Sequence, residues 1–368
     1  MSKIYFPNLN GLRFIAALLV VIHHVEQFRK ILGRPNYFDN PFIKITGKIG
    51  VILFFVLSGF LITYLLIKEQ QESNTISISD FYKRRILRIW PLYFLLIIIA
   101  FFILPNISFF NIGKVSEALT DNFGLKLFLF VFFLPNLALG LFPPIPFASQ
   151  AWSIGYEEQL YLVWPWIVKL KKNITVIILS LVSMFYLSNV LAFTVFKDIL
   201  IEHDLVKVAE IFYDFPAYDS LLIGGFLAYL SIYKRPVLTF FFTKYFQVAL
   251  YLITILSIVY GFQIPFVNNL FYAILFALII ANLALNEKSV LNLENKGLNY
   301  FGKISYGVYM YHSIAIIIVL KLLPKFNLEN VFLEYLFSVL ITLAISTLSF
   351  EFFENIFIKK KVKFSRLK

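Results

Sequence analysis

The chain has 368 residues, of which 60% are hydrophobic and 19% aromatic, while only 15% are charged. Soluble domains usually carry about a quarter charged residues, and here the apolar residues are gathered into long runs, which indicates a polytopic membrane protein. The formal charge of +12 does not indicate nucleic-acid binding, because the basic residues lie in short loops between apolar runs, as in cytoplasmic loops of membrane proteins. The absence of cysteine excludes disulfides, thiolate nucleophiles and cysteine-ligated metals, and no metal site is expected.

A helix needs about 20 mostly apolar residues to cross a bilayer. The runs that qualify, or nearly do, are 10–28, 49–67, 87–104, 152–168, 174–196, 215–233, 245–262, 266–285, 304–323 and 331–357. A further run, Leu125–Leu137, is short and is interrupted by Pro135 and Asn136. The predicted fold class is therefore all-α: a polytopic membrane helix bundle of about ten transmembrane helices plus a short re-entrant or broken helix. We expect a single domain over residues 1–368.

The distribution of charge predicts the orientation. With the N-terminus inside, the segments that fall on the cytoplasmic side are Lys83-Arg84-Arg85 with Arg88, Lys169, Lys171 and Lys172, Lys234-Arg235, Lys288, Lys296 and Lys303, and the tail Lys359–Lys361, Lys363, Arg366 and Lys368. The acidic loop 197–212 falls outside. The first loop is an exception, because its basic residues Arg29, Lys30, Arg34, Lys44 and Lys48 also fall outside. Both termini are thus predicted to be cytoplasmic, and the long first run lacks the small-residue site of a cleavable signal peptide.

The first run carries ionisable residues at membrane depth. Within Asn8–Phe28 these are Arg13, His23 and His24, and such groups are functional-site candidates because they are costly in lipid. Arg13 and His24 are close to three helical turns apart, so we expect both on one face, roughly 16 Å apart along the axis. His23 points about 100° away from His24, so one of the pair has a structural or supporting role, and we expect His24 to be the catalytic one.

Polar residues recur in short motifs within or beside the later apolar runs. The motifs are Gly11-Leu12-Arg13 with His24; Gly50-Val51 followed by Phe54–Ile62; Arg85-x-x-Arg88-Ile89-x-Pro91-x-Tyr93; Trp152-Ser153-Ile154 with Glu157-Glu158-Gln159-x-Tyr161 and Trp164-Pro165; and Gly302-x-Ile304-Ser305-Tyr306-Gly307-x-Tyr309 with His312. In this order, and over nearly the whole chain, they resemble the integral-membrane acyltransferase 3 family. Each motif alone is a weak signal, whereas the ordered set is specific.

The resemblance implies a membrane acyltransferase. Members of the family move acetyl or other short acyl groups from acyl-CoA onto sugars of surface polysaccharides, lipopolysaccharide, peptidoglycan, glucans or small acceptors. The expected donor is therefore acetyl-CoA or another acyl-CoA, with no permanently bound cofactor. The expected acceptor is a glycan or a lipid-linked sugar, and the expected location is the bacterial inner membrane, in contact with lipid. The chain ends soon after its last run and so resembles the stand-alone form, while its oligomeric state is not indicated.

Helix depth gives this chemistry a predicted layout. His24 should lie roughly 21–23 Å from the inner edge and Glu157 and Glu158 roughly 8–9 Å below the outer edge, so across a core about 30 Å thick these levels coincide. His312 should lie near the middle. Arg13, Arg85 and Arg88 should lie near the inner edge, where arginines suit the phosphates of acyl-CoA.

The predicted reaction uses His24 as general base on an acceptor hydroxyl, with Glu157 or Glu158 setting its tautomer. The hydroxyl then attacks the thioester carbonyl. The oxyanion donor is left open among Arg13, Trp152, Tyr161 and backbone N–H groups. Direct transfer needs fewer assumptions than a covalent acyl-histidine, which also stays open.

Each candidate has a structural alternative. The alternatives are snorkelling for Arg13, a topology marker for Arg85 and Arg88, helix capping for Glu157 and Glu158, a backbone-carbonyl bond for His24, and helix packing for His312. The Phe54–Ile62 stretch is predicted to pack, with Ser58-Gly59 allowing close helix contact. The basic C-terminus is interpreted as an orientation signal that also suits anionic lipid.

Two other functions compete with the enzyme. A transporter of a solute or acyl group would also bury Arg, His and Glu, but no matching halves with interrupted helices are evident. A structural scaffold would have little reason to bury such a set.

Overall fold

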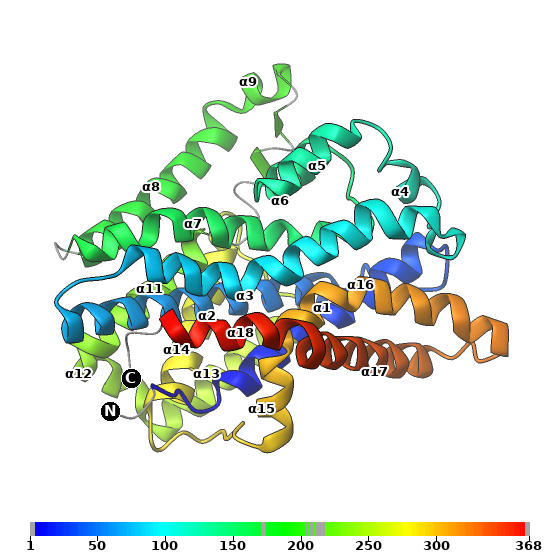
Figure 1. The fold of residues 1–368 in the computed structure, drawn as a ribbon. Helices are drawn as coiled ribbons and strands as arrows, with labels where there is room; N and C mark the ends of the chain where they lie inside the picture. Colours follow the sequence, from blue (N-terminus) through cyan, green and yellow to red (C-terminus); the bar gives the residue numbers. More distant parts are fainter. Residues whose placement is uncertain (1–3, 171–173, 204, 207–208, 211–217, 365–368) are drawn as a thin grey trace.

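The computed structural model describes residues 4–170, 174–203, 205–206, 209–210 and 218–364, and this part of the chain holds helices and no strand (Figure 1). The main helices are α1 (Leu9–Ile31), α2 (Pro41–Ser73), α3 (Ile78–Ile98), α7 (Trp152–Lys169), α8 (Ile174–Thr194), α11 (Tyr218–Tyr233), α13 (Lys244–Val259), α14 (Asn268–Leu285), α16 (Ser305–Leu322) and α17 (Val331–Ser349). The shorter helices are α4 (Lys114–Glu117), α5 (Phe123–Val131), α6 (Pro135–Leu141), α9 (Lys197–Glu202), α12 (Arg235–Thr239), α15 (Lys296–Lys303) and α18 (Asn355–Lys361). Positions that the topology prediction used at 171, 172, 366 and 368, in loop 197–212 at 204, 207, 208, 211 and 212, and at 215–217 lie outside the described residues.

The predicted all-α membrane bundle is confirmed, and each of the predicted runs holds a helix. The count of about ten spans is approximate. Among the described residues, 7 helices are long and apolar enough to cross a membrane, or up to 8 if the pair Tyr218–Tyr233 and Arg235–Phe242, bent by 109°, is one span. The helix Lys244–Val259 is shorter, and α7 is not among the 7, because Glu157, Glu158 and other polar residues lower its hydropathy.

The interrupted run after residue 125 is a broken helix, as predicted. Helix α5 ends at Val131, Phe133 adopts a positive φ of 58°, and α6 begins at Pro135. Proline suits the first turn of a helix because its missing N–H is not needed there. The chain therefore breaks and restarts before Asn136, which lies buried next to α7.

Glycine allows α2 and α11 to touch through their backbones. A Cβ added at Gly59 would lie 2.0 Å from the carbonyl oxygen of Leu221, and one added at Gly224 would lie 2.1 Å from that of Val56. Neither distance can hold a carbon atom. The predicted close helix contact at Ser58-Gly59 is thus confirmed, and it anchors the side of the bundle formed by α11 and α14.

Helix α1 lies at the centre of the fold. It contacts α2 on one side and α15, α16 and α17 on others, while α7 contacts both α2 and α3 (Figure 1). Its buried apolar residues include Ala16, Ala17 and Val20, whose small size allows close packing. This packing holds the polar face of α1 against α2, α7 and α16 rather than against lipid.

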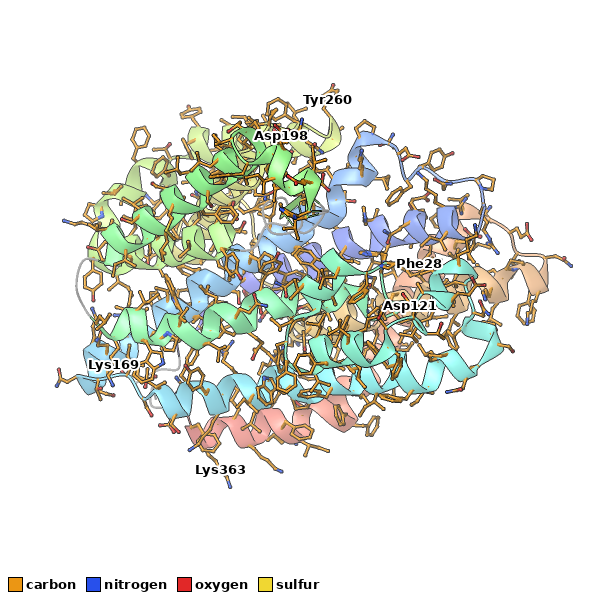
Figure 2. The ribbon with its side chains drawn as sticks, turned by 90° about the horizontal axis from the view of Figure 1, so that it is seen from above. Phe28, Asp121, Lys169, Asp198, Tyr260 and Lys363 are labelled. Carbon is orange, nitrogen blue, oxygen red and sulfur yellow. The ribbon has the colours of Figure 1, made fainter. Side chains whose placement is uncertain are left out.

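The last helix, α18, packs along α3. After α17 the chain makes a π-helical turn, Phe350–Glu354, and α18 then runs along α3. Arg84 Nη1 donates to the carbonyl of Phe364 at 2.7 Å and Arg84 Nη2 pairs with buried Glu69 at 2.9 Å. The start and end of the described chain therefore lie at one end of the bundle, because Ile4 and Lys361 line the same cavity. Figure 2 shows Lys169 and Lys363 toward this end and Phe28 and Asp121 toward the other.

Acidic partners neutralise several basic residues of the first loop. Glu334 of α17 accepts hydrogen bonds from Arg29 and Arg34, the Arg29 side chain is 5% exposed and that of Glu334 4%. Buried Glu26 lies beside Arg29 and accepts a bond from Tyr335 at 2.8 Å. This network offers a reason for the exception in the predicted charge pattern, since paired charges act less as orientation signals.

Candidate active site

A cavity of about 220 Å³, here called the arginine cavity, opens between α1, α2, α3, α7, α16 and α18. Its ionisable lining residues are Arg13, Arg85, Arg88, Glu157, Tyr161, Tyr306, Tyr309 and Lys361. The predicted convergence of Arg13, Arg85 and Arg88 is therefore observed. Four cationic side chains face one lining carboxylate, so the cavity suits an anionic ligand.

The arginines are positioned by aromatic rings and acids. The guanidinium of Arg85 lies 5.8 Å from the ring centroid of Tyr161, and its buried Nε has no hydrogen-bond partner among the described residues. Arg88 lies 5.9 Å from the ring of Tyr306, and its Nη1 is 3.9 Å from Glu354 Oε2. Arg88 thus lies beside an acid of the protein and lines the arginine cavity, whereas Arg85 lines both this cavity and the one next to it.

Glu157 belongs to the arginine cavity. Its carboxylate accepts hydrogen bonds from the hydroxyls of Tyr161 and Ser58, and it is attracted to Arg85 and Arg13. Ser58 Oγ and the Tyr161 hydroxyl are themselves 2.5 Å apart. This cluster joins α2 and α7 and places one negative charge near Arg85 and Arg13.

A second cavity of about 250 Å³, the entrance cavity, shares Arg13, Ser58, Arg85 and Lys361 with the arginine cavity. Its other lining residues are Ile4, Tyr5, Phe6, Leu9, Asn10, Leu61, Ile62 and Leu65. Tyr5 donates a hydrogen bond to Glu294, and partial burial together with this carboxylate raises the pKa of Tyr5 to about 12. The two cavities are therefore adjacent, with the shared cations between them, and the entrance cavity lies at the end of the bundle where the chain begins.

His24 faces a different cavity. This histidine cavity, of about 400 Å³, is lined by His24 and Gln27 of α1, by Gln150 and Trp152 at the start of α7, and by Ser313 of α16. Most of its remaining lining is apolar, from α1, the loop before α7 and Ile112. It is thus large enough for part of a sugar-sized ligand, with polar groups gathered on one wall.

A hydrogen-bonded set of residues links the linings of the two cavities. We call Gln150, Ser153, Tyr309 and His312 the polar partition. Ser153 Oγ donates to the Tyr309 hydroxyl at 2.9 Å, and that hydroxyl donates to the Gln150 carbonyl at 2.8 Å. Ser153 and Tyr309 line the arginine cavity, whereas Gln150 lines the histidine cavity. The guanidinium groups and the imidazole therefore line two cavities that these residues connect.

The local contacts of His24 orient its ring. His24 Nδ1 lies 2.8 Å from the Val20 carbonyl, one turn back on α1, so Nδ1 carries the proton and Nε2 keeps a free lone pair. Its ring centroid is 4.6 Å from that of His312 and 5.1 Å from that of His23. A neutral imidazole with a free Nε2 facing a cavity can accept a proton from a hydroxyl.

The expected pairing of His24 with a carboxylate is not what the structure shows. The Val20 carbonyl, rather than Glu157 or Glu158, is at Nδ1. The predicted depths place the start of α7 at the membrane edge, but Trp152, its first residue, lines the same cavity as His24. Glu157 comes more than one turn later and so reaches the level of Arg13 instead.

The other carboxylate, Glu158, points toward α3. Its Oε2 accepts a hydrogen bond from Trp90 Nε1 at 2.9 Å, while its Oε1 is buried without a partner among the described residues. The two acids, adjacent in sequence, therefore occupy different environments, and Glu157 is the one that lines a cavity.

Two other histidines, His23 and His312, lie near the His24 ring. His23 Nδ1 lies 2.9 Å from the Ile43 carbonyl, and its ring packs where Gly47 leaves room on α2. His312 is completely buried, with Nδ1 2.6 Å from the Tyr309 carbonyl and Nε2 unpartnered among the described residues. His312 thus lies in the partition beside His24, while His23 joins α1 to α2.

The three predicted oxyanion donors are separated. Trp152 lines the histidine cavity, whereas Arg13 and Tyr161 line the arginine cavity. Trp152 is therefore the one that lies on the same side of the partition as His24.

Four residues that line the cavities were not predicted to belong to the site. Lys361 was assigned to an orientation signal, and Ser58 to packing; Gln150 and Tyr306 received no role. Gln150 and Ser153 lie on either side of Trp152 in the sequence. Polar residues at the start of an apolar helix are the sequence feature that could have indicated site residues here. Among the described residues, no group of His, Asp and Glu is arranged to hold a metal ion.

The chain is similar in sequence to known proteins. A family model described as an acyltransferase domain matches residues 6–351. The chain is 29% identical to the peptidoglycan O-acetyltransferase OatA of Listeria monocytogenes, over 96% of this chain and 56% of that protein. It is 28% identical to the O-acetyltransferase OatA of Staphylococcus aureus, over 98% of this chain and 58% of that protein. The chain thus spans little more than half the length of these relatives. No solved structure gives a significant match. Because the family model matches most of the chain, the protein belongs to the acyltransferase 3 family.

Proposed function

We propose that this protein is a membrane O-acyltransferase that moves an acetyl group, or another short acyl group, from acyl-CoA to a hydroxyl of a cell-wall glycan or a lipid-linked glycan precursor. The observation that carries the proposal is the serial arrangement of a cation-rich cavity, a single polar partition and His24. The O-acetyltransferase names of the relatives support acetyl as the group and a cell-wall glycan as the acceptor.

The donor fits the arginine and entrance cavities. The phosphates of acyl-CoA pair with Arg85 and Arg13, because guanidinium groups bind phosphate through bidentate hydrogen bonds. Since acyl-CoA is made in the cytoplasm, the entrance cavity faces that side, with both termini there. The protein is then a multi-pass protein of the bacterial cell membrane, and the histidine cavity lies toward the acceptor.

The reaction requires the polar partition to open. The thioester carbon of the donor comes within reach of the acceptor hydroxyl when the Ser153–Tyr309–Gln150 bonds open or shift. His24 Nε2 takes the hydroxyl proton, the hydroxyl oxygen bonds to the carbonyl carbon, and the carbon–sulfur bond breaks. The thiolate of CoA leaves and takes up a proton. Trp152 is the side-chain donor best located to stabilise the oxyanion on this side.

The test uses the full chain in phosphatidylcholine nanodiscs with labelled acetyl-CoA and soluble peptidoglycan oligosaccharides as acceptor. We expect base-labile acetyl esters on the sugar, and a fall of about 10²–10⁴-fold in transfer for His24→Ala. CoA binding should be unchanged, because His24 lies outside the arginine cavity.

His203→Ala is the matched control, because it removes an exposed imidazole from the end of α9. It should transfer at the wild-type rate. Wild-type transfer by His24→Ala would contradict the proposed role of the imidazole. Failure of the wild-type protein to bind or consume acetyl-CoA would contradict the donor and favour the transporter.

A further inference from the structure

We propose that Lys361, near the end of the described chain, binds a phosphate of the donor, so that α18 forms one wall of the donor site. This inference rests on the proposed function, because it takes acyl-CoA as the anionic ligand. It assigns a binding role to a residue in a segment whose sequence indicates only an orientation signal.

The position of Lys361 differs from that of its neighbours. Lys359, Lys360 and Lys361 form the last turn of α18, where basic residues suit the helix dipole. Lys359 and Lys360 are exposed, and Lys360 lies 5.9 Å from the ring of Phe357. Lys361 is half-buried and lines both the arginine cavity and the entrance cavity. The helix dipole acts on all three lysines, so it does not explain why Lys361 alone of the three lines these cavities.

The charges around Lys361 are nearly all of its own sign. Arg85, Arg88, Arg13 and Arg84 all repel its ammonium group. Arg84 is paired with Glu69, Arg88 lies beside Glu354, and Arg13 and Arg85 are attracted to Glu157. Like charges held in a partly desolvated cavity repel one another, and a bound phosphate would remove that cost.

The contacts of α18 hold Lys361 in this place. The Arg84 bond to the Phe364 carbonyl fixes the chain after α18. Arg88 and Glu354 fix the turn before it. Both arginines lie on α3: Arg84 directly precedes Arg85, and Arg88 follows it by three residues, about one turn. The same helix thus carries Arg85 and positions Lys361 in the lining of the same two cavities, where the two can contact one diphosphate.

The experiment measures binding of CoA to the full chain in phosphatidylcholine nanodiscs, which contain no anionic lipid. Lys361→Ala should weaken binding about tenfold, because a charge-assisted hydrogen bond to phosphate is lost. Lys361→Arg should bind within about twofold of the wild type, since it keeps a cation there. Lys360→Ala is the matched control, with the same loss of charge outside the cavity, and should leave binding unchanged.

The outcomes separate the two proposals. If the wild type binds CoA and Lys361→Ala matches Lys360→Ala, the role of Lys361 is wrong while the proposed function stands. If the wild type does not bind CoA, both fall. A lipid headgroup is the other source of phosphate. If Lys361→Ala changes only the effect of adding phosphatidylglycerol to the nanodiscs, and not CoA binding, the ligand of Lys361 is lipid and this proposal is overturned. The thermal midpoint of each variant confirms folding.

Discussion

The three arginines of α3, Arg84, Arg85 and Arg88, differ in how far they are bound by other groups of the protein. Arg84 is held by Glu69 and by the Phe364 carbonyl, and Arg88 by Glu354 and the carbonyl of Lys303. Arg85, between them, lies near the Tyr161 ring, lines both cavities, and has an Nε without a partner in the described part of the chain. At the scale of residues, therefore, Arg85 is the arginine of α3 best prepared to bind an external anion, and Arg88 serves mainly to neutralise a buried acid.

This difference predicts that substitution of Arg85 affects mainly CoA binding, whereas substitution of Arg88 affects mainly stability. Arg85→Ala should weaken CoA binding by about tenfold or more with little change in thermal midpoint, because the lost interactions are with the ligand. Arg88→Ala should lower the thermal midpoint, because Glu354, 3% exposed, loses its cation. Adding Glu354→Gln to Arg88→Ala should restore part of that loss.

Lys83→Ala is the control for Arg85→Ala, since Lys83 is exposed and lies 5.0 Å from the Phe364 ring instead of in a cavity. Binding isotherms and thermal scans of the purified variants give both quantities. Equal CoA affinity for Arg85→Ala and Lys83→Ala would mean that Arg85 only marks topology, as the structural alternative holds.

At the scale of elements, the site depends on how closely α2 approaches its neighbours. Ser58 of α2 bonds Tyr161 of α7 on one face, while the next residue, Gly59, meets the backbone of α11 on the other. The polar contact and the close backbone contact therefore come from adjacent residues. A change in the α2–α11 distance would move Ser58 within the arginine cavity.

We expect Gly59→Ala to destabilise the protein by about 2 kcal/mol or more, because its methyl group has no space against the Leu221 carbonyl. Gly124→Ala adds the same methyl group to α5, where nothing lies within 4 Å, and should be neutral or slightly stabilising. Thermal unfolding in one detergent compares the two. A Gly59→Ala protein as stable as Gly124→Ala would show that the helices do not pack this closely.

Much of this arrangement was predictable from sequence, for identifiable reasons. Apolar runs of membrane length indicated the helices, and Pro135 indicated the broken one. Helical periodicity put Arg13 and His24 into cavities in series on α1, and the i, i+3 spacing put Arg85 and Arg88 into one cavity. These features depend on local geometry within single helices.

The remaining features depend on where one helix starts relative to another. Sequence does not reveal that α7 begins within the bundle, so the predicted meeting of Glu157 with His24 failed. It also does not reveal that α18, which continues α17, packs along α3 and so brings Lys361 into the arginine cavity. The Val20 carbonyl at His24 Nδ1 comes from backbone, which motifs do not encode.

At the scale of the whole molecule, ionic contacts tie α1 to α17 beyond the histidine cavity. Arg29 and Arg34 both bond Glu334, with the Arg34 bond at 2.8 Å. By contrast, Lys30 and Asp39 form an ion pair at 2.7 Å whose side chains are 47% and 75% exposed. A buried network and an exposed pair thus occur in the same region of the chain.

Breaking the buried network should cost more than breaking the exposed pair. Glu334→Gln should destabilise the protein by about 3 kcal/mol, because two guanidinium groups lose their carboxylate in a desolvated place. Asp39→Asn should change stability by no more than about 0.5 kcal/mol, because water screens the pair. Chemical unfolding in detergent measures both, and similar effects of the two substitutions would contradict the burial assigned to Glu334.

The most direct test of the account is a cryo-electron microscopy structure with a non-hydrolysable acetyl-CoA analogue. We expect density for the phosphates between Arg85, Arg13 and Lys361, and density for the acyl end passing Ser153 and Tyr309 toward His24 Nε2. Density for the analogue outside the arginine cavity, or an acyl end that stops short of an intact polar partition with His24 closed off behind it, would contradict the account.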